Sequence, residues 1–149
     1  MYSTILIPLD GSKRAEVILS HVEEMARKMG SRIILLTCVE QEPVHTGDLE
    51  ISAMVKRDED MGQRTKITTS YLQEVQMKLE QQGIQVSTTI MQGPPVKAIL
   101  AVAAQENVDM IAIASHGRSG LGRVFYGSVA AGVLQRVDRP LLIIRAKEG

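Results

Sequence analysis

The sequence predicts an α/β protein with one parallel sheet of five strands and helices on both faces of that sheet. Five short segments have the length and composition of strands, and most of them are continuous apolar runs, as expected of strands buried on both sides. Four segments with apolar residues at helical spacing separate these runs. Such alternation is typical of parallel sheets with right-handed crossovers. The 149 residues predict one domain with its own core.

The chain begins with a predicted strand, helix and strand. Residues 4–9 (TILIPL) form the first strand, with Pro8 near its end, and residues 10–12 (DGS) form a turn in which Ser12 caps the next segment. Apolar residues recur at helical spacing over residues 15–29, and Gly30 closes this helix. Residues 32–39 (RIILLTCV) predict the second buried strand.

The middle of the chain predicts a loop, a helix and an edge strand. Residues 40–54 are polar and without a clean period, so we expect a surface loop near the strand ends. Residues 55–82 predict an amphipathic helix whose pattern is clear only after Gly62. Residues 84–91 alternate apolar and polar side chains, which indicates a strand with one exposed face. The apolar stripe of the helix is Ile67, Tyr71, Val75 and Leu79.

The last third repeats the alternation. Residues 93–95 (GPP) precede a helix, and an apolar strand follows at residues 110–114. A helix over residues 128–137 and a strand at residues 141–145 (LLIIR) complete the chain. The helix after the prolines turns Val96, Ile99, Leu100 and Ala103 inward.

The loop after the fourth strand carries the strongest functional signal. Glycines let a ligand approach the main chain and leave N–H groups exposed, and the helix that begins at Ser128 adds further free N–H groups. Arg118 and Arg123 in this loop favour an anion site over a merely flexible connection. The glycines are Gly117, Gly120, Gly122 and Gly127.

The predicted site lies where the first and fourth strands end. In an open parallel sheet, the loops that leave two central strands in opposite directions enclose a crevice. Residues 8–10 (PLD) would then face residues 114–117 (ASHG), so that Asp10 accepts hydrogen bonds from ribose and the glycine loop binds phosphates. The alternative for Asp10 is an ordinary turn residue before Gly11.

Several catalytic signatures are absent from the sequence. There is no phosphate-binding lysine motif and no dinucleotide fingerprint after the first strand. No nucleophile elbow surrounds Ser128, so we interpret it as a helix cap and a hydrogen-bond donor to phosphate. His116 adjoins the crevice, either as a general base or as a residue that holds the loop by a hydrogen bond. These features predict that the protein binds a nucleotide but catalyses little reaction on it. We assign neither catalytic nor metal-binding residues.

Composition narrows the classes of partner. The 17 basic and 17 acidic residues balance, which gives no electrostatic reason to expect nucleic acid or membrane surfaces as partners. No segment resembles a transmembrane helix or a signal peptide, so we expect a cytoplasmic protein. The single cysteine, Cys38, lies in an apolar run and predicts a buried, inert thiol.

These residues together resemble the universal stress protein family, in its nucleotide-binding branch. That branch carries G-x-x-G, nine residues and G-[ST] after the fourth strand, and here the pattern falls on residues 114–117, 118–126 and 127–128. The resemblance covers the whole chain, from ILIPLDGS to RPLLIIR. The sequence departs from the pattern at Ala114, where the first glycine would stand, and a methyl group there weakens binding if the position needs positive φ or tight contact.

The resemblance implies a Rossmann-like fold of the adenine nucleotide alpha hydrolase type, with strand order 3-2-1-4-5 and ATP or AMP in the crevice. It places Pro8 and Asp10 beside the adenosine and the backbone of Cys38 at the adenine edge. The sugar and phosphates would lie among Ile113, Ala114, Gly117, Gly127, Ser128 and Val129. We add Leu9, His116, Gly120, Arg118 and Arg123 as neighbours in the same strand end and loop.

Three functions stay open at this point. The first is a stress-response protein in which nucleotide binding reshapes residues 40–54 and changes a partner-binding surface. The second is slow ATP hydrolysis, with His116 or Asp10 orienting water and Mg²⁺ bridging the phosphates. The third is a dimeric module that binds no nucleotide. The resemblance also implies a homodimer formed through residues 141–145.

Overall fold

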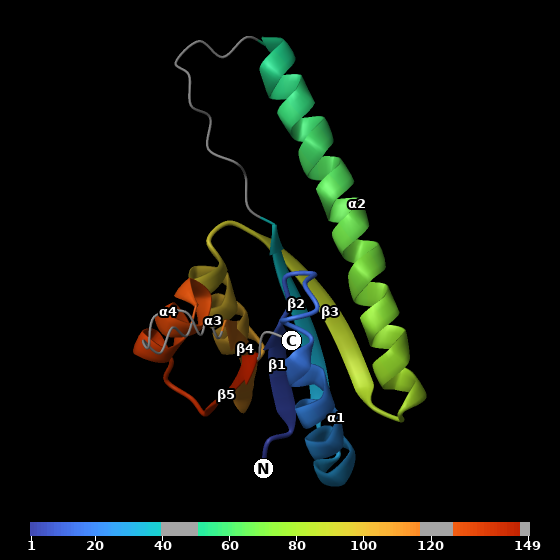
Figure 1. Ribbon diagram of the computed structural model, residues 1–149, viewed down its shortest axis with the longest axis vertical. Coiled ribbons are helices and arrows are strands. Elements are labelled where there is room, and N and C mark those ends of the chain that lie inside the picture. The colour runs from blue at the N-terminus through green and yellow to red at the C-terminus, as the bar shows by residue number, and fades with distance from the viewer. Residues whose placement is uncertain (40–50, 117–126, 147–149) are drawn as a thin grey trace.

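The computed structural model describes residues 1–39, 51–116 and 127–146, with only the backbone described for residues 51–58 and His116. Its centre is a five-stranded sheet of order β3-β2-β1-β4-β5, in which every neighbouring pair is parallel (Figure 1). The predicted fold class and strand order are therefore confirmed. The strands are β1 (Thr4–Pro8), β2 (Arg32–Val39), β3 (Gln85–Gln92), β4 (Met110–His116) and β5 (Leu141–Ala146).

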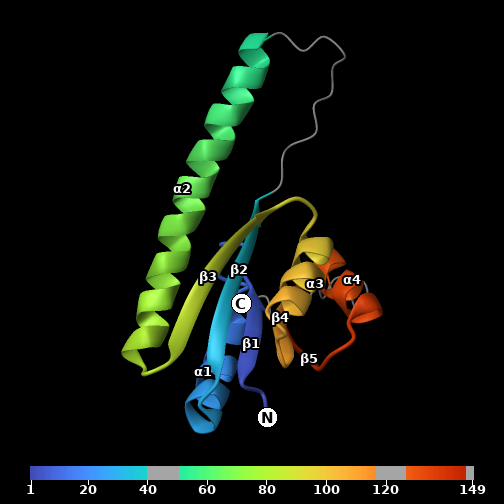
Figure 2. The ribbon, with the colours of Figure 1, turned by 180° about the vertical axis from the view of Figure 1, so that it is seen from behind.

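Two helices cover each face of the sheet. The helices are α1 (Val17–Met29), α2 (Ile51–Gln81), α3 (Pro95–Gln105) and α4 (Ser128–Arg136), and Figures 1 and 2 show the two layers from opposite sides. A hydrophobic core lies on each face of the sheet, and because side chains alternate along a strand, each strand contributes residues to both cores. Ile5 and Ile33 pack with α1 and α2, whereas Leu6 and Ile34 pack with α3 and α4.

Helix α2 differs from its predicted extent and packing. It begins at Ile51, so residues 51–54 are helical rather than part of a loop, and it continues through Gly62. With 31 residues it is about 46 Å long at 1.5 Å per residue, and its N-terminal half extends past the sheet (Figure 1). Ile67 is consequently 64 % exposed, while Leu72, Val75 and Leu79 form the buried stripe.

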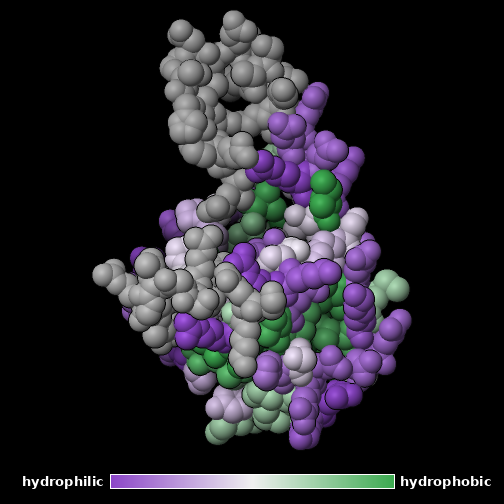
Figure 3. Space-filling view, in the orientation of Figure 1, coloured by the Kyte–Doolittle hydropathy of each residue, from purple (hydrophilic) through white to green (hydrophobic). Residues whose placement is uncertain are grey.

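The described part of the α2 projection carries mostly hydrophilic side chains (Figure 3). The prediction that Ile67 belongs to a buried apolar stripe was wrong, because this part of α2 extends past the sheet that covers the rest of the helix. No helix in the described ranges combines the length and the apolarity needed to cross a bilayer.

Strands β1 and β4 pair only at their beginnings. The ladder joins Ile5 to Met110 and Leu6 to Ile111, and it goes no further. The N–H of Leu9 donates to the carbonyl oxygen of Leu36 in β2. Because the backbone groups of successive strand residues face opposite neighbours, the backbone nitrogen of Pro8 faces β4. That nitrogen has no hydrogen and cannot extend the ladder. The two strands therefore separate toward their carboxyl ends.

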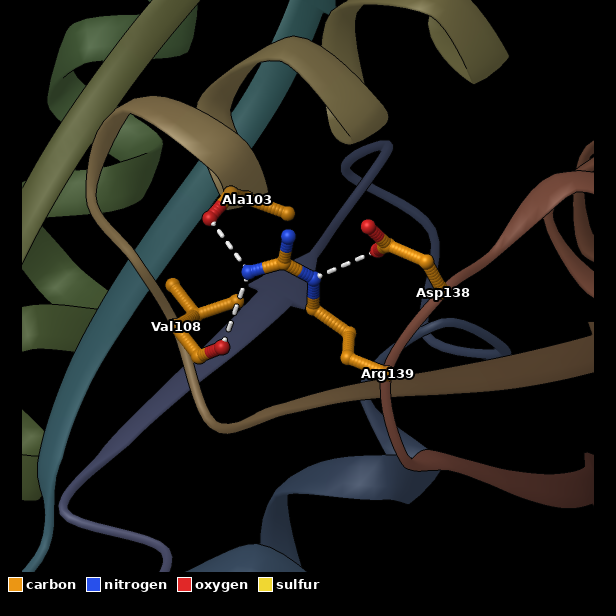
Figure 4. Close-up of polar contacts among 4 residues, drawn as sticks. All are labelled: Ala103, Val108, Asp138 and Arg139. Carbon is orange, nitrogen blue, oxygen red and sulfur yellow. Dashed lines mark hydrogen bonds and ion pairs between the residues drawn. The ribbon is translucent and has the colours of Figure 1, made fainter.

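Arg139 joins three parts of the α3/α4 side of the fold (Figure 4). Its Nη1 donates to the carbonyl oxygens of Ala103, at 2.8 Å, and Val108, at 3.0 Å. Its Nε lies 3.0 Å from Oδ1 of Asp138. Ala103 belongs to the last turn of α3, where carbonyl groups lack helical partners, so Arg139 ties this helix end and the approach to β4 to the start of β5.

Candidate functional site

A cavity of about 130 Å³ opens at the carboxyl ends of β1 and β4, where these strands separate. Walls come from both layers of the fold, which is the expected geometry at the switch point of an open parallel sheet. The lining residues are Pro8, Leu9, Asp10, Arg14, Ala15, Leu36, Cys38, Pro95, Ile99, Ile113, Ala114, Ser115, Gly127, Ser128, Val129 and Ala130.

The structure brings together much of the site predicted from the sequence. The residues from both sources that line the cavity are Pro8, Leu9, Asp10, Cys38, Ile113, Ala114, Gly127, Ser128 and Val129. Gly117, Arg118, Gly120 and Arg123 lie outside the described residues, as does the side chain of His116. Cys38 is half-buried, less enclosed than predicted. That these residues bind a nucleotide stays a prediction.

Asp10 both orders its turn and lines the cavity. Its Oδ1 accepts hydrogen bonds from the backbone N–H of Ser12 at 2.9 Å and from Ser12 Oγ–H at 2.6 Å. Ser12 Oγ in turn accepts from the N–H of Ala15, which orders the turn before α1. Asp10 Oδ2 has no hydrogen-bond partner among the described residues. The turn role and the ligand role considered for Asp10 are therefore compatible.

Helix α4 points its N-terminus at the cavity. Gly127 is the N-cap residue, with φ of +68°, and its carbonyl oxygen accepts the first helical bond from the N–H of Ala131. The N–H groups of Ser128, Val129 and Ala130 have no acceptor within the helix. Ser128 was predicted to cap this helix, but it is the first helical residue and makes no capping bond with its side chain. These groups and the helix dipole suit an anion.

The backbone at Ala114 tolerates alanine without strain. Ala114 lies within β4, pairs with Ile144 of β5 and is not among the described residues with positive φ. An extended conformation is accessible to any L-residue. The departure from the family pattern at this position therefore costs no backbone strain, and its methyl group contributes to the cavity wall.

Sequence reasoning missed several lining residues. Arg14 belongs to the turn after Asp10, and Ser115 lies inside the quoted motif. The position of each residue in the sequence could therefore have placed it at the site. The apolar walls had no such signal, because they come from the turn before α1 and from three separate elements, β2, α3 and α4. These wall residues are Ala15, Leu36, Pro95, Ile99 and Ala130.

Tyr71 connects α2 to this region. Burial, together with the nearby carboxylates of Glu16 and Asp10, raises the pKa of Tyr71. The phenol therefore keeps its proton at neutral pH and remains a neutral group between α2 and the turn that carries Asp10.

Carboxylates, histidines and cysteines do not cluster within the described ranges. No group of three or more such residues there is placed to hold a metal ion. Asp10 is the carboxylate that lines the cavity. The described chemistry of the site is thus one acid, one arginine, two serine hydroxyls, free backbone N–H groups and an apolar wall.

The fold and the cavity define a class: an open parallel α/β protein with a cavity at its switch point and a helix N-terminus on one side of that cavity. The model of the universal stress protein family matches residues 1–145, so the chain belongs to that family. The expectation drawn from the sequence is confirmed.

Individual relatives agree with this assignment. The universal stress protein MJ0577 of Methanocaldococcus jannaschii is 28 % identical over 99 % of this chain and 97 % of its own length. Its solved structure superposes with a TM-score of 0.84 at 29 % identity, covering 100 % of this chain and 99 % of that one. Universal stress protein Sll1654 of Synechocystis is 31 % identical over 97 % of this chain and 86 % of its own.

Two more distant structures share the fold and contain nucleotides. One is a universal stress protein in complex with cAMP, with a TM-score of 0.71 at 18 % identity, covering 98 % of each chain. The other is the universal stress protein of Archaeoglobus fulgidus in complex with dAMP, with a TM-score of 0.63 at 17 % identity, covering 95 % of this chain and 97 % of that one. At these identities the likeness shows the fold alone.

Proposed function

We propose that this protein binds an adenine nucleotide, ATP or AMP, in the cavity between β1 and β4, and that it acts as a dimeric regulatory protein of the cytoplasmic stress response. One observation carries the proposal: where β1 and β4 separate, the same cavity is lined by the N-terminus of α4 and by Asp10, whose Oδ2 accepts no hydrogen bond from a described residue. The Asp10 carboxylate, as an acceptor for ribose hydroxyls, and the α4 N–H groups, as donors for phosphate, would thus act in one largely apolar pocket. The nucleotides bound by two proteins of the same fold support this choice of ligand.

The chemistry of the described groups favours binding over turnover. An anion at the α4 N-terminus would be held by backbone N–H groups and hydroxyls, which need no metal and activate no water. The apolar wall, which includes Leu36, Pro95 and Ile99, suits the flat face of a base. We therefore propose that nucleotide occupancy, rather than hydrolysis, is the signal. The change in residues 40–54 on binding stays a prediction, since residues 40–50 lie outside the described residues and residues 51–54 belong to α2.

Calorimetric titration of nucleotide-stripped protein with ATP and AMP tests the proposal. We expect saturable binding, and we expect Asp10→Asn to weaken it about tenfold, equivalent to about 1.4 kcal/mol. Asn keeps an Oδ1 acceptor for Ser12 but places an amide donor where Oδ2 would accept from ribose. The turn therefore survives while the ligand contact is lost.

One control variant separates the role of Asp10 in the turn from its role in binding. Ser12→Ala removes the hydroxyl partner of Oδ1 and leaves Oδ2 in place, so it should change affinity less than Asp10→Asn does. No heat of binding up to millimolar ATP or AMP would refute the proposal outright. Equal losses in the two variants would assign Asp10 to the turn alone.

A further inference from the structure

Ser115 presents a buried hydroxyl that has no hydrogen-bond partner in the described part of the chain. The residue is only 3 % exposed, and its Oγ makes no hydrogen bond with any described residue. Two other buried hydroxyls in the described part share this condition, Thr37 Oγ1 and Tyr71 OH. Of the three residues, Ser115 lines the cavity and the other two do not.

The place of Ser115 in β4 puts its side chain on the sheet face that carries α4, whose N-terminus suits an anion. Ser115 lies four residues after Ile111 in β4, so the two side chains are on the same face of the sheet. Ile111 packs with α3 and α4, and this is therefore the face that these helices cover. The first turn of α4 lines the same cavity with Ser128 and Val129. Ser115 of β4 and the first turn of α4, whose N–H groups have no acceptor within the helix, therefore line one cavity.

A buried hydroxyl without a partner destabilises the protein unless something else accepts its hydrogen. A charged phosphate oxygen is the strongest acceptor that the proposed ligand offers. We infer that Ser115 Oγ–H donates a hydrogen bond to a phosphate oxygen of the bound nucleotide, next to the N–H groups of α4. This inference rests on the proposed function and adds a ligand contact that the G-x-x-G…G-[ST] pattern does not specify.

The test compares Ser115→Ala with the wild-type protein in calorimetric titrations of AMP, ATP and adenosine. Ser115→Ala should bind AMP and ATP about tenfold more weakly and adenosine with unchanged affinity, because only the phosphate contact is lost. The ligand-free variant should have a Tm equal to or above that of the wild type, since no protein hydrogen bond is removed. A hydroxyl with a purely structural role would instead lower the Tm.

Thr37→Val is the matched control. It removes another unpaired buried hydroxyl, on the opposite face of the sheet, and should leave all three affinities unchanged. Ser115→Cys, which fills the space of the hydroxyl with a somewhat larger thiol that donates only weakly, should repeat the Ser115→Ala result if alanine perturbs folding.

The outcomes distinguish this inference from the proposed function. Wild-type affinity for AMP in Ser115→Ala would overturn the inference and leave nucleotide binding intact. An equal loss for adenosine and AMP would also overturn it, because the hydroxyl would then act on the nucleoside or the wall. If the wild-type protein binds no adenine nucleotide, the proposed function fails and this inference fails with it.

Discussion

At the scale of single residues, Arg14 is the cation that lines the cavity from the described part of the chain. It lies in the turn between β1 and α1, beside Asp10, and it forms no ion pair with a described residue. An exposed guanidinium near bound phosphates attracts them, but solvent and salt screen the attraction. Arg14 should therefore tune affinity according to ligand charge rather than create the site.

Arg14→Gln should weaken ATP binding about threefold, AMP binding less, and adenosine binding not at all. The effect should shrink as salt is raised, and calorimetry at two ionic strengths measures it. Lys13→Gln makes the same charge change at the next residue, which does not line the cavity. If Lys13→Gln reproduced the Arg14→Gln result, overall charge rather than a local contact would explain the effect.

At the scale of elements, Arg139 holds the end of α3 against the start of β5. Arg139→Ala should lower the free energy of unfolding by about 2–3 kcal/mol, because the Ala103 and Val108 carbonyls lose a charged donor from a side chain that is only 17 % exposed. Asp138→Ala should have little effect, since Asp138 is exposed. Urea denaturation measures both variants, and similar losses in the two would contradict the role given to the carbonyl contacts.

Helices α3 and α4 approach closely at Gly132. A Cβ added at Gly132 would lie 2.7 Å from Cγ2 of Val96, a stiff β-branched side chain on α3. Gly132→Ala should therefore destabilise the protein by about 1 kcal/mol, because overpacking outweighs the gain in helix propensity. Nucleotide affinity should fall as well, since Pro95 and Val129 of the two helices line the cavity.

Thermal denaturation with a matched glycine variant tests this packing argument. Gly62→Ala in α2 adds a Cβ that meets nothing within 4 Å, so it should raise stability by up to about 1 kcal/mol. Adding Val96→Ala to Gly132→Ala should recover part of the loss. Stabilisation by Gly132→Ala alone would show that α3 and α4 are not closely packed in solution.

At the scale of the whole molecule, the sheet has two edge strands, β3 and β5, and no other described strand pairs with their outer sides. The exposed part of β3 includes polar Ser87 and Thr88, whereas residues 141–144 of β5 are half-buried and apolar. Unpaired backbone groups beside apolar side chains favour pairing with a second strand. We therefore place the proposed dimer interface at β5.

Ile143→Lys should shift the mass measured by light scattering from dimer to monomer, because twofold pairing would bring like charges together at this edge. Thr88→Lys adds the same charge to the β3 edge and should leave the mass unchanged. A wild-type monomer at high concentration would refute the dimer, and dissociation by Thr88→Lys alone would move the interface to β3.

The sequence by itself determined the alternation of strands and helices, and with it the sheet, because local apolar periodicity decides which face of each element is buried. It also located the crevice, since Pro8, Asp10 and the glycines mark the ends of β1 and β4 within a few residues. The predictions for Ser128 as a cap and Ile67 as a core residue were wrong. Both depended on where a helix ends and on how far its neighbours extend.

Only the tertiary structure decided which side chains meet. Arg14 and Ser115 line one cavity although they are far apart in the sequence, and Arg139 contacts carbonyls of α3 and the α3–β4 connection. The unpaired state of Ser115 Oγ likewise depends on every neighbour that surrounds it. Such contacts follow from the packing of layers against a twisted sheet, and no periodicity within a single segment encodes the distance between two elements.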